Sequence, residues 1–170
     1  MKKRKTNIFF QISALLVMIA IFYFSSQSGG ESSGLSLKVT RLFSRLLFFD
    51  FSSMTPEQQN IVISGLHPFV RKLAHFSVYA VLGMCVYSFI VASGFRFSAK
   101  GFIAWICCII YAIGDEIHQN FVPARAMQFT DVLIDSAGAL LGIFVASVLI
   151  VLFMYVSGSL VPKDSRNQHT

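Results

Sequence analysis

The sequence predicts an all-α protein that crosses a membrane about four times. Hydrophobic residues make up 55% of the 170 residues and charged residues only 13%, whereas soluble domains carry roughly 25% charged residues. In water such a chain would expose large apolar patches, so a bilayer is the better solvent. The apolar residues gather in four runs, each close to the roughly 20 residues that a helix needs to cross the hydrocarbon core. Backbone groups in lipid must bond within their own segment, so these runs are helices.

The first span is expected over residues 8–24, directly after the basic residues Lys2, Lys3, Arg4 and Lys5. A secretory signal peptide has a shorter apolar core, of about 7–15 residues, and a small-residue cleavage site behind it. No convincing site of that kind follows this run. We therefore expect an uncleaved membrane anchor.

Three further spans are expected over residues 73–92, 99–117 and 132–156, within a single domain covering 1–170. A cytoplasmic N-terminus places more basic residues inside than outside, as the positive-inside rule requires. The inner set is Lys2, Lys3, Arg4, Lys5, Arg96, Lys100, Lys163 and Arg166, and the outer set is Lys38, Arg41, Arg45, Arg71, Lys72 and Arg125. We predict a multi-pass protein of the cell membrane with both termini in the cytoplasm.

Residues 25–70 form the predicted outer loop between the first two spans, beginning with a loop-like run over 25–30. An amphipathic helix follows, with Leu35, Val39, Leu42, Phe43 and Leu46 on one face and Lys38, Arg41, Ser44 and Arg45 on the other. This pattern fits a helix in the membrane interface and also an ordinary helix packed on the bundle. Thr55 and Pro56 predict a further helix start, which His67-Pro68 is expected to end.

Ionisable residues gather at the outer end of the predicted spans, where their burial is costly and points to a function. The second span carries Arg71, His75 and Tyr79 on one face with Lys72 beside them, and the third carries Asp115, His118 and Gln119 with Glu116 beside them. Arg125 lies in the next loop, and Asp131 and Asp135 open the fourth span. Each group could also be structural, as a rim ion pair or a hydrogen-bonded histidine. Their convergence is what indicates a site.

A stripe of small residues continues from Asp135 through Gly138, Gly142 and Ala146. Small residues at this spacing let helices approach closely, which predicts that the Asp135 face points into the bundle. The same stripe could serve dimerisation, so the oligomeric state is left open.

These polar residues carry a resemblance to VanZ-like membrane proteins. The motifs are Arg71-Lys72-Leu73-Ala74-His75-Phe76, then Asp115-Glu116-Ile117-His118-Gln119-Asn120-Phe121-Val122-Pro123-Ala124-Arg125, and Asp131-Val132-Leu133-Ile134-Asp135-Ser136-Ala137-Gly138. The exit from the first span, Phe22 to Gln27, also resembles the family, and the resemblance covers roughly residues 8–155. Ala124 departs from the pattern, which has Gly before the Arg. The resemblance implies a bacterial cell-envelope protein associated with low-level resistance to the glycopeptide teicoplanin, and no defined reaction.

Two classes of function satisfy these patterns. In the first, the protein acts on or binds an anionic envelope lipid at the outer leaflet. Its catalytic residues would be His75, Asp115, Glu116, His118 and Asp135, and its substrate-binding residues Arg71, Lys72, Tyr79, Gln119, Arg125 and Asp131. In the second, a non-catalytic protein binds a cell-wall lipid or lipoglycopeptide, or supports another membrane protein, and its polar cluster is structural. A transporter has less support, because no midplane charge or paired repeat is present.

No particular cofactor is predicted. Histidine and carboxylate ligands would suit Zn or Mn, yet no H-E-x-x-H or comparable motif occurs. Cys85, Cys107 and Cys108 lie inside apolar runs without metal-type spacing and are expected to be small core residues. The basic residues form no stripe with interleaved aromatics, so nucleic acid is not an expected partner. The expected partners are membrane lipids.

Overall fold

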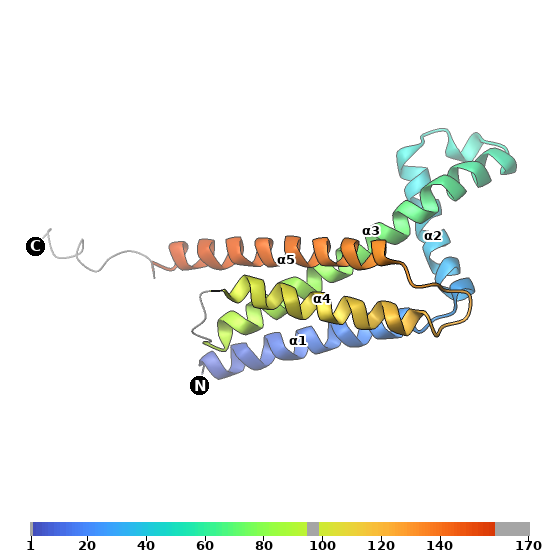
Figure 1. Cartoon of the computed structure of the whole chain (residues 1–170). Coiled ribbons are helices and arrows are strands. Elements are labelled where there is room, and N and C mark those ends of the chain that lie inside the picture. Colours follow the sequence, from blue (N-terminus) through green and yellow to red (C-terminus); the bar gives the residue numbers. More distant parts are fainter. Residues whose placement is uncertain (1, 95–98, 159–170) are drawn as a thin grey trace, which may run out of the picture.

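In the computed structural model the described residues are 2–94 and 99–158. Their elements are α1 (Lys2–Ser25), α2 (Gly29–Leu47), the short 3-10 helix η1 (Phe51–Ser53), α3 (Pro56–Ala92), α4 (Lys100–Gln119) and α5 (Phe129–Val156). Figure 1 shows α1, α4 and α5 running alongside the second half of α3, while α2 and the first half of α3 project at one end. Three residues of the orientation argument, Arg96, Lys163 and Arg166, lie outside the described residues, as do the side chains of Lys2–Lys5 and of Leu35.

Within the described residues, four helices are long and apolar enough to cross a membrane, which confirms the predicted helical membrane bundle. These segments are Thr6–Ser25, Pro56–Ala92, Lys100–Gln119 and Phe129–Val156. At about 1.5 Å per residue, the 37 residues of α3 extend over roughly 55 Å, well beyond a hydrocarbon core of about 30 Å. The first half of α3 therefore stands outside the span predicted over 73–92.

The start of α3 was predicted correctly and its expected interruption was not. The Thr55 hydroxyl accepts a hydrogen bond from the Gln58 backbone N–H, and the Gln58 side chain accepts one from Thr55 N–H, so a full capping box begins the helix. The prediction that His67-Pro68 ends this helix is wrong, because Pro68 lies inside it. Proline removes one helical hydrogen bond locally, whereas Ile63 and Val70 stay buried on either side of it.

The second helix, α2, packs on α3 through small polar residues. Thr40 and Ser44 are fully buried, and the Ser44 hydroxyl donates to the Thr40 carbonyl at 2.9 Å. The expectation that Ser44 shares the exposed basic face is therefore wrong: its hydroxyl is satisfied within the helix, and its small size permits close packing. Leu42 and Leu46 remain exposed. Thus α2 is packed on the bundle and still presents an apolar flank, as an interfacial helix requires.

Close backbone contact joins α3 to α5. A Cβ added at Gly138 would overlap the carbonyl of Phe76, and one at Gly142 would overlap the carbonyl of Ala80. From the other side, a Cβ at Gly83 would overlap the carbonyl of Ala139. The predicted small-residue stripe thus serves packing within the bundle, where absent side chains let two helices touch by their backbones. We call these contacts the α3–α5 seam.

The remaining helices close around a core that contains Tyr79, Leu82 and Cys108. The Tyr111 hydroxyl donates to the Met18 carbonyl at 2.7 Å, which ties α4 to α1. Cys108 is buried as expected, but Cys107 is exposed, which corrects its assignment to the core. Neighbouring positions on a helix differ by about 100° in direction, so two adjacent cysteines do not share one buried face.

Candidate functional site

The polar residues meet at the end of the bundle where α1 and α4 finish, α5 begins and α3 passes by (Figure 1). Helical spacing sets which side chains of each element face inward. On α3 these are Arg71 and His75, and on α5 they are Asp131 and Asp135. The loop 120–128 between α4 and α5 covers this end.

His75 and Asp135 form a pair across α3 and α5. His75 Nδ1 lies 3.5 Å from Asp135 Oδ1, and the Asp135 side chain is 1% exposed. The α3–α5 seam holds this geometry, because Gly138 follows Asp135 by almost one turn and touches Phe76, the neighbour of His75. A buried carboxylate beside Nδ1 orients an imidazole ring.

Arg125 links three parts of the chain. Its Nη1 donates to Gln119 Oε1 at 3.0 Å, and its Nη2 donates to the Phe24 carbonyl at 3.1 Å. Gln119 Nε2 in turn donates to Asp115 Oδ2 at 3.1 Å. Burial and then the charge of Arg71 hold the pKa of the Arg125 guanidinium below its ordinary value. The loop, the end of α1 and the end of α4 are therefore fixed by one guanidinium.

Two further carboxylates have structural partners at the rim. Glu116 Oε1 accepts a hydrogen bond from the Gln128 backbone N–H at 2.6 Å, just before α5 begins. Lys72 Nζ lies 4.0 Å from Asp131 Oδ1, with the lysine side chain 45% exposed. Glu116 positions the loop, and the Lys72–Asp131 pair is the kind of partly exposed ion pair that contributes little to stability.

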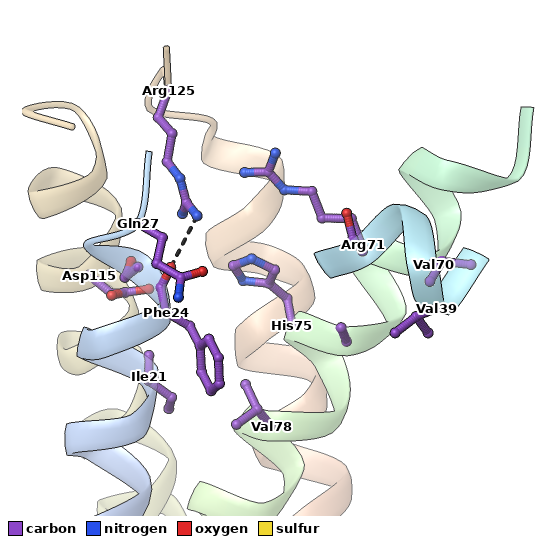
Figure 2. Close-up of a pocket in the computed structure, with 13 residues that line it drawn as sticks. Ile21, Phe24, Gln27, Val39, Val70, Arg71, His75, Val78, Asp115 and Arg125 are labelled. Carbon is purple, nitrogen blue, oxygen red and sulfur yellow. Dashed lines mark hydrogen bonds between the residues drawn. The ribbon is translucent and has the colours of Figure 1, made fainter. Parts of the chain in front are cut away.

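A cavity of about 290 Å³ opens between these groups. Of the predicted site residues, Arg71, His75, Asp115 and Arg125 line it. Figure 2 shows Arg71 and Arg125 reaching toward each other, with His75 below them and Asp115 on the side opposite Arg71. The remaining lining residues are Ile21, Phe24, Ser25, Gln27, Ser36, Val39, Val70, Ala74 and Val78. The site therefore combines two cations, an imidazole and a carboxylate with a largely apolar wall.

The family model described as VanZ/LLP1 matches residues 10–153 of the chain. The chain belongs to the VanZ/LLP1 family. No curated protein and no solved structure matches it. For this VanZ/LLP1 member the first two motifs quoted from the sequence lie on α3 and on α4 with its following loop, which contribute lining residues to the cavity. The third motif opens α5 and places Asp135 against His75 of the cavity wall.

Several predicted site residues of this VanZ/LLP1 member lie away from the cavity. The His118 ring stacks on Phe22, with centroids 4.6 Å apart, and its Nε2 lies 3.0 Å from the Ser26 hydroxyl. It lines a second groove, of about 340 Å³, between α1 and α4, and among the described residues this groove shares Asp115 alone with the first cavity. The first cavity is not lined by Lys72, Tyr79, Glu116, Gln119, Asp131 or Asp135 either, although Asp135 contacts His75, which does line it.

The first and second helices contribute cavity residues to which sequence reasoning assigned no role. Gln27 and Phe24 come from the exit of α1, while Ser36 and Val39 come from α2. The exit of α1 was part of the VanZ-like resemblance, which was the available signal. Nothing in the α2 sequence distinguishes the two residues that face a cavity from those that face α3.

No metal site is evident in the described part of this VanZ/LLP1 member. Within residues 2–94 and 99–158, no three His, Cys, Asp or Glu side chains are grouped so that they could hold a metal ion. Arg71, Arg125 and His75 instead provide donors for an anion, and bidentate guanidinium groups suit phosphate and carboxylate.

The turn before Arg125 contains a residue under backbone strain. Ala124 has φ +59°, in the left-handed region that favours glycine and where the VanZ-like pattern has Gly. Replacement by Gly removes about 1–2 kcal/mol of strain and loses about 0.4–1 kcal/mol to the freer unfolded chain. We therefore expect Ala124→Gly to raise the free energy of unfolding by about 0.5 kcal/mol.

The opposite substitution tests the same strain. Ala124→Val is expected to lower stability by more than about 1 kcal/mol, because a β-branched residue is poorly tolerated at positive φ. Thermal unfolding of both variants in detergent measures the difference. Equal stability of the Gly and Val variants would contradict a left-handed Ala124.

Proposed function

We propose that this VanZ/LLP1 membrane protein binds the phosphate of an envelope lipid in the cavity formed by α1, α2, α3, α4 and the loop 120–128. We further propose that the cavity faces the outer leaflet, and that lipid binding there underlies the low-level teicoplanin resistance that the family resemblance implies. The observation that carries the proposal is the pair of guanidinium groups, Arg71 and Arg125, over an apolar wall (Figure 2).

The state of the cations supports an anionic ligand. Among the described residues, the guanidinium of Arg125 donates to two neutral oxygens, those of the Gln119 amide and the Phe24 carbonyl. Its Nε is buried without a hydrogen-bond partner in the described part of the chain. An incoming phosphate would satisfy this donor and would also relieve the repulsion between Arg125 and Arg71.

The size and lining of the cavity support a lipid. At about 290 Å³ it lies near the lower end of small-molecule sites, which span roughly 300–1,000 Å³. That volume accommodates a headgroup and the beginning of its chains. Ile21, Val70 and Val78 supply an apolar wall beside the cations, as an amphipathic ligand requires.

The outward direction of the site rests on charge. The basic run Lys2–Lys5 favours a cytoplasmic N-terminus, and α1 then delivers its other end, with Phe24, to the outer face. On the same side, Lys38, Arg41 and Arg45 of α2 are exposed, where they suit lipid headgroups.

The test of the proposal is lipid affinity. Arg71→Ala and Arg125→Ala are each expected to weaken the binding of phosphatidic acid to the purified full-length protein by about tenfold or more, since a hydrogen bond to a charged group contributes about 1.5–3 kcal/mol. Native mass spectrometry with titrated lipid measures this loss. Arg45→Ala is the matched control, because Arg45 is exposed on α2 away from the cavity. Equal affinity in all four proteins would overturn the proposal.

A second candidate function is chemistry on the bound headgroup, and the His75–Asp135 pair favours it. A histidine oriented by a buried carboxylate is a suitable general acid or base. In that case the protein converts a bound lipid at a rate that His75→Ala lowers by about 10²-fold or more. Mass analysis of lipids incubated with wild type and variant distinguishes binding from turnover.

A further inference from the structure

The cavity holds an acceptor as well as its cations. Asp115 lines the wall and is 6% exposed. Its Oδ2 receives the hydrogen bond from Gln119, while its Oδ1 is buried without a hydrogen-bond partner among the described residues. The Tyr79 hydroxyl lies close to this carboxylate and is likewise buried without a hydrogen-bond partner among the described residues. A buried carboxylate oxygen left without a donor is costly, so a donor from a ligand would stabilise Oδ1.

The other carboxylates at this end do not line the cavity, although Glu116 Oε2 and Asp135 Oδ1 are also buried without a hydrogen-bond partner among the described residues. Glu116 accepts from the loop backbone, Asp131 faces Lys72 and Asp135 faces His75. Asp115 is the carboxylate that lines the cavity, and it lies opposite Arg71 with Arg125 above (Figure 2). The two ends of the cavity therefore have opposite charge preferences.

From this arrangement we infer the class of headgroup, taking the proposed phosphate site as given. The headgroup joins a phosphate, held by Arg71 and Arg125, to a hydrogen-bond donor that reaches Asp115 Oδ1. The donor is an ammonium or a hydroxyl, as in phosphatidylethanolamine or phosphatidylglycerol. A quaternary ammonium has no N–H and does not meet the requirement.

Because the two ends of the cavity prefer opposite charges, a ligand that carries only negative charge fits the cavity less well. A phosphate at the guanidinium groups lies in the same small cavity as the Asp115 carboxylate, and like charges in a confined apolar site repel. A donor between the two anions turns this repulsion into a hydrogen bond. Specificity then comes from both ends of the cavity, since a headgroup without the donor leaves Oδ1 unsatisfied.

The test uses the purified full-length protein and four phospholipids with the same acyl chains. Phosphatidylethanolamine, phosphatidylglycerol and phosphatidylcholine share a phosphodiester and differ in the donor, while phosphatidic acid reports on the phosphate site alone. Wild type is expected to bind phosphatidylethanolamine or phosphatidylglycerol about tenfold more tightly than phosphatidylcholine. Preference for the first identifies an ammonium donor, and preference for the second a hydroxyl.

Asp115→Asn is expected to reduce this preference to less than about threefold, while the affinity for phosphatidic acid is kept or raised. Asp50→Asn is the control, since Asp50 is an exposed carboxylate before η1 whose side chain makes no capping bond. If wild type binds phosphatidic acid but treats the three diester lipids alike, the headgroup inference fails and the phosphate site stands. If it binds none of the four, both fail. Because the wild-type series needs no variant, misfolding of Asp115→Asn does not prevent the test.

Discussion

Gly142→Ala is expected to lower the free energy of unfolding by about 2 kcal/mol or more, because one added methyl group forces α3 and α5 apart. A Cβ at Gly142 would overlap the backbone carbonyl of Ala80. A backbone carbonyl in a helix cannot move aside as a flexible side chain does. In most exposed helical positions the same substitution is favourable, since Ala exceeds Gly in helix propensity by about 1 kcal/mol.

The expected change in stability on Gly→Ala replacement thus has opposite signs at Gly142 and at an exposed helical position, and an exposed glycine supplies the control. A Cβ at Gly114, on α4, would meet nothing within 4 Å, so Gly114→Ala is expected to leave stability unchanged or raise it by up to about 1 kcal/mol. Thermal unfolding in detergent, followed by circular dichroism, compares the two variants. Equal effects of the two substitutions would show that the α3–α5 seam is not closely packed.

The seam also sets the site geometry, so its disruption has a functional consequence. Gly138 touches α3 at Phe76, next to His75, and any separation there lengthens the 3.5 Å contact between His75 and Asp135. Gly138→Ala is therefore expected to damage the site as well as the stability of the bundle.

Loss of teicoplanin protection is the expected result for both His75→Ala and Asp135→Asn, in a sensitive Gram-positive host in which the wild-type protein protects. His75→Ala removes the cavity imidazole and leaves the buried Asp135 carboxylate without its partner. Asp135→Asn keeps the shape of the side chain and removes the charge that orients the imidazole. The minimum inhibitory concentration of teicoplanin measures the effect.

Protein levels decide how that result is interpreted. Leaving a buried carboxylate without its partner is destabilising, so the amount of each variant in the membrane must be compared with wild type. Asp50→Asn, an exposed carboxylate outside the cavity, is expected to protect as wild type does. If His75→Ala and Asp135→Asn reach wild-type levels and still protect, the polar cluster is structural. If wild type gives no protection, the teicoplanin part of the proposal fails, whereas lipid binding remains open to its own test.

Much of the fold follows from local sequence patterns. Runs of apolar residues mark the four helices that are able to span a membrane, because the need for a helix in lipid depends only on length and composition. The helix start at Thr55 and Pro56 was likewise predicted from adjacent residues. Pro68 was misjudged, since the local rule on proline takes no account of the packing that keeps α3 continuous on both sides of it.

The helix faces that carry the site residues were predictable, but the contacts between their side chains were not. A period of 3.6 residues places Arg71 and His75 on one side of α3, and the small residues after Asp135 turn it toward the bundle. The same reasoning grouped His118 with Asp115, whereas the structure directs His118 to Phe22 and Ser26 of α1. Two positions three residues apart share a broad face but diverge by about 60°, so Asp115 lines both cavities whereas His118 lines the second alone.

Hydropathy and helical period therefore establish the membrane helices, the polar end and the inward face of α5, because each of these depends on residues close together in the chain. Tertiary structure alone decides that Asp135 pairs with His75, that Arg125 closes on Phe24 and Gln119, and that Asp115 Oδ1 is buried without a hydrogen-bond partner among the described residues. Those outcomes depend on how closely helices approach. That distance is set by backbone contact at Gly138 and Gly142. It cannot be deduced from the spacing of residues within a single helix.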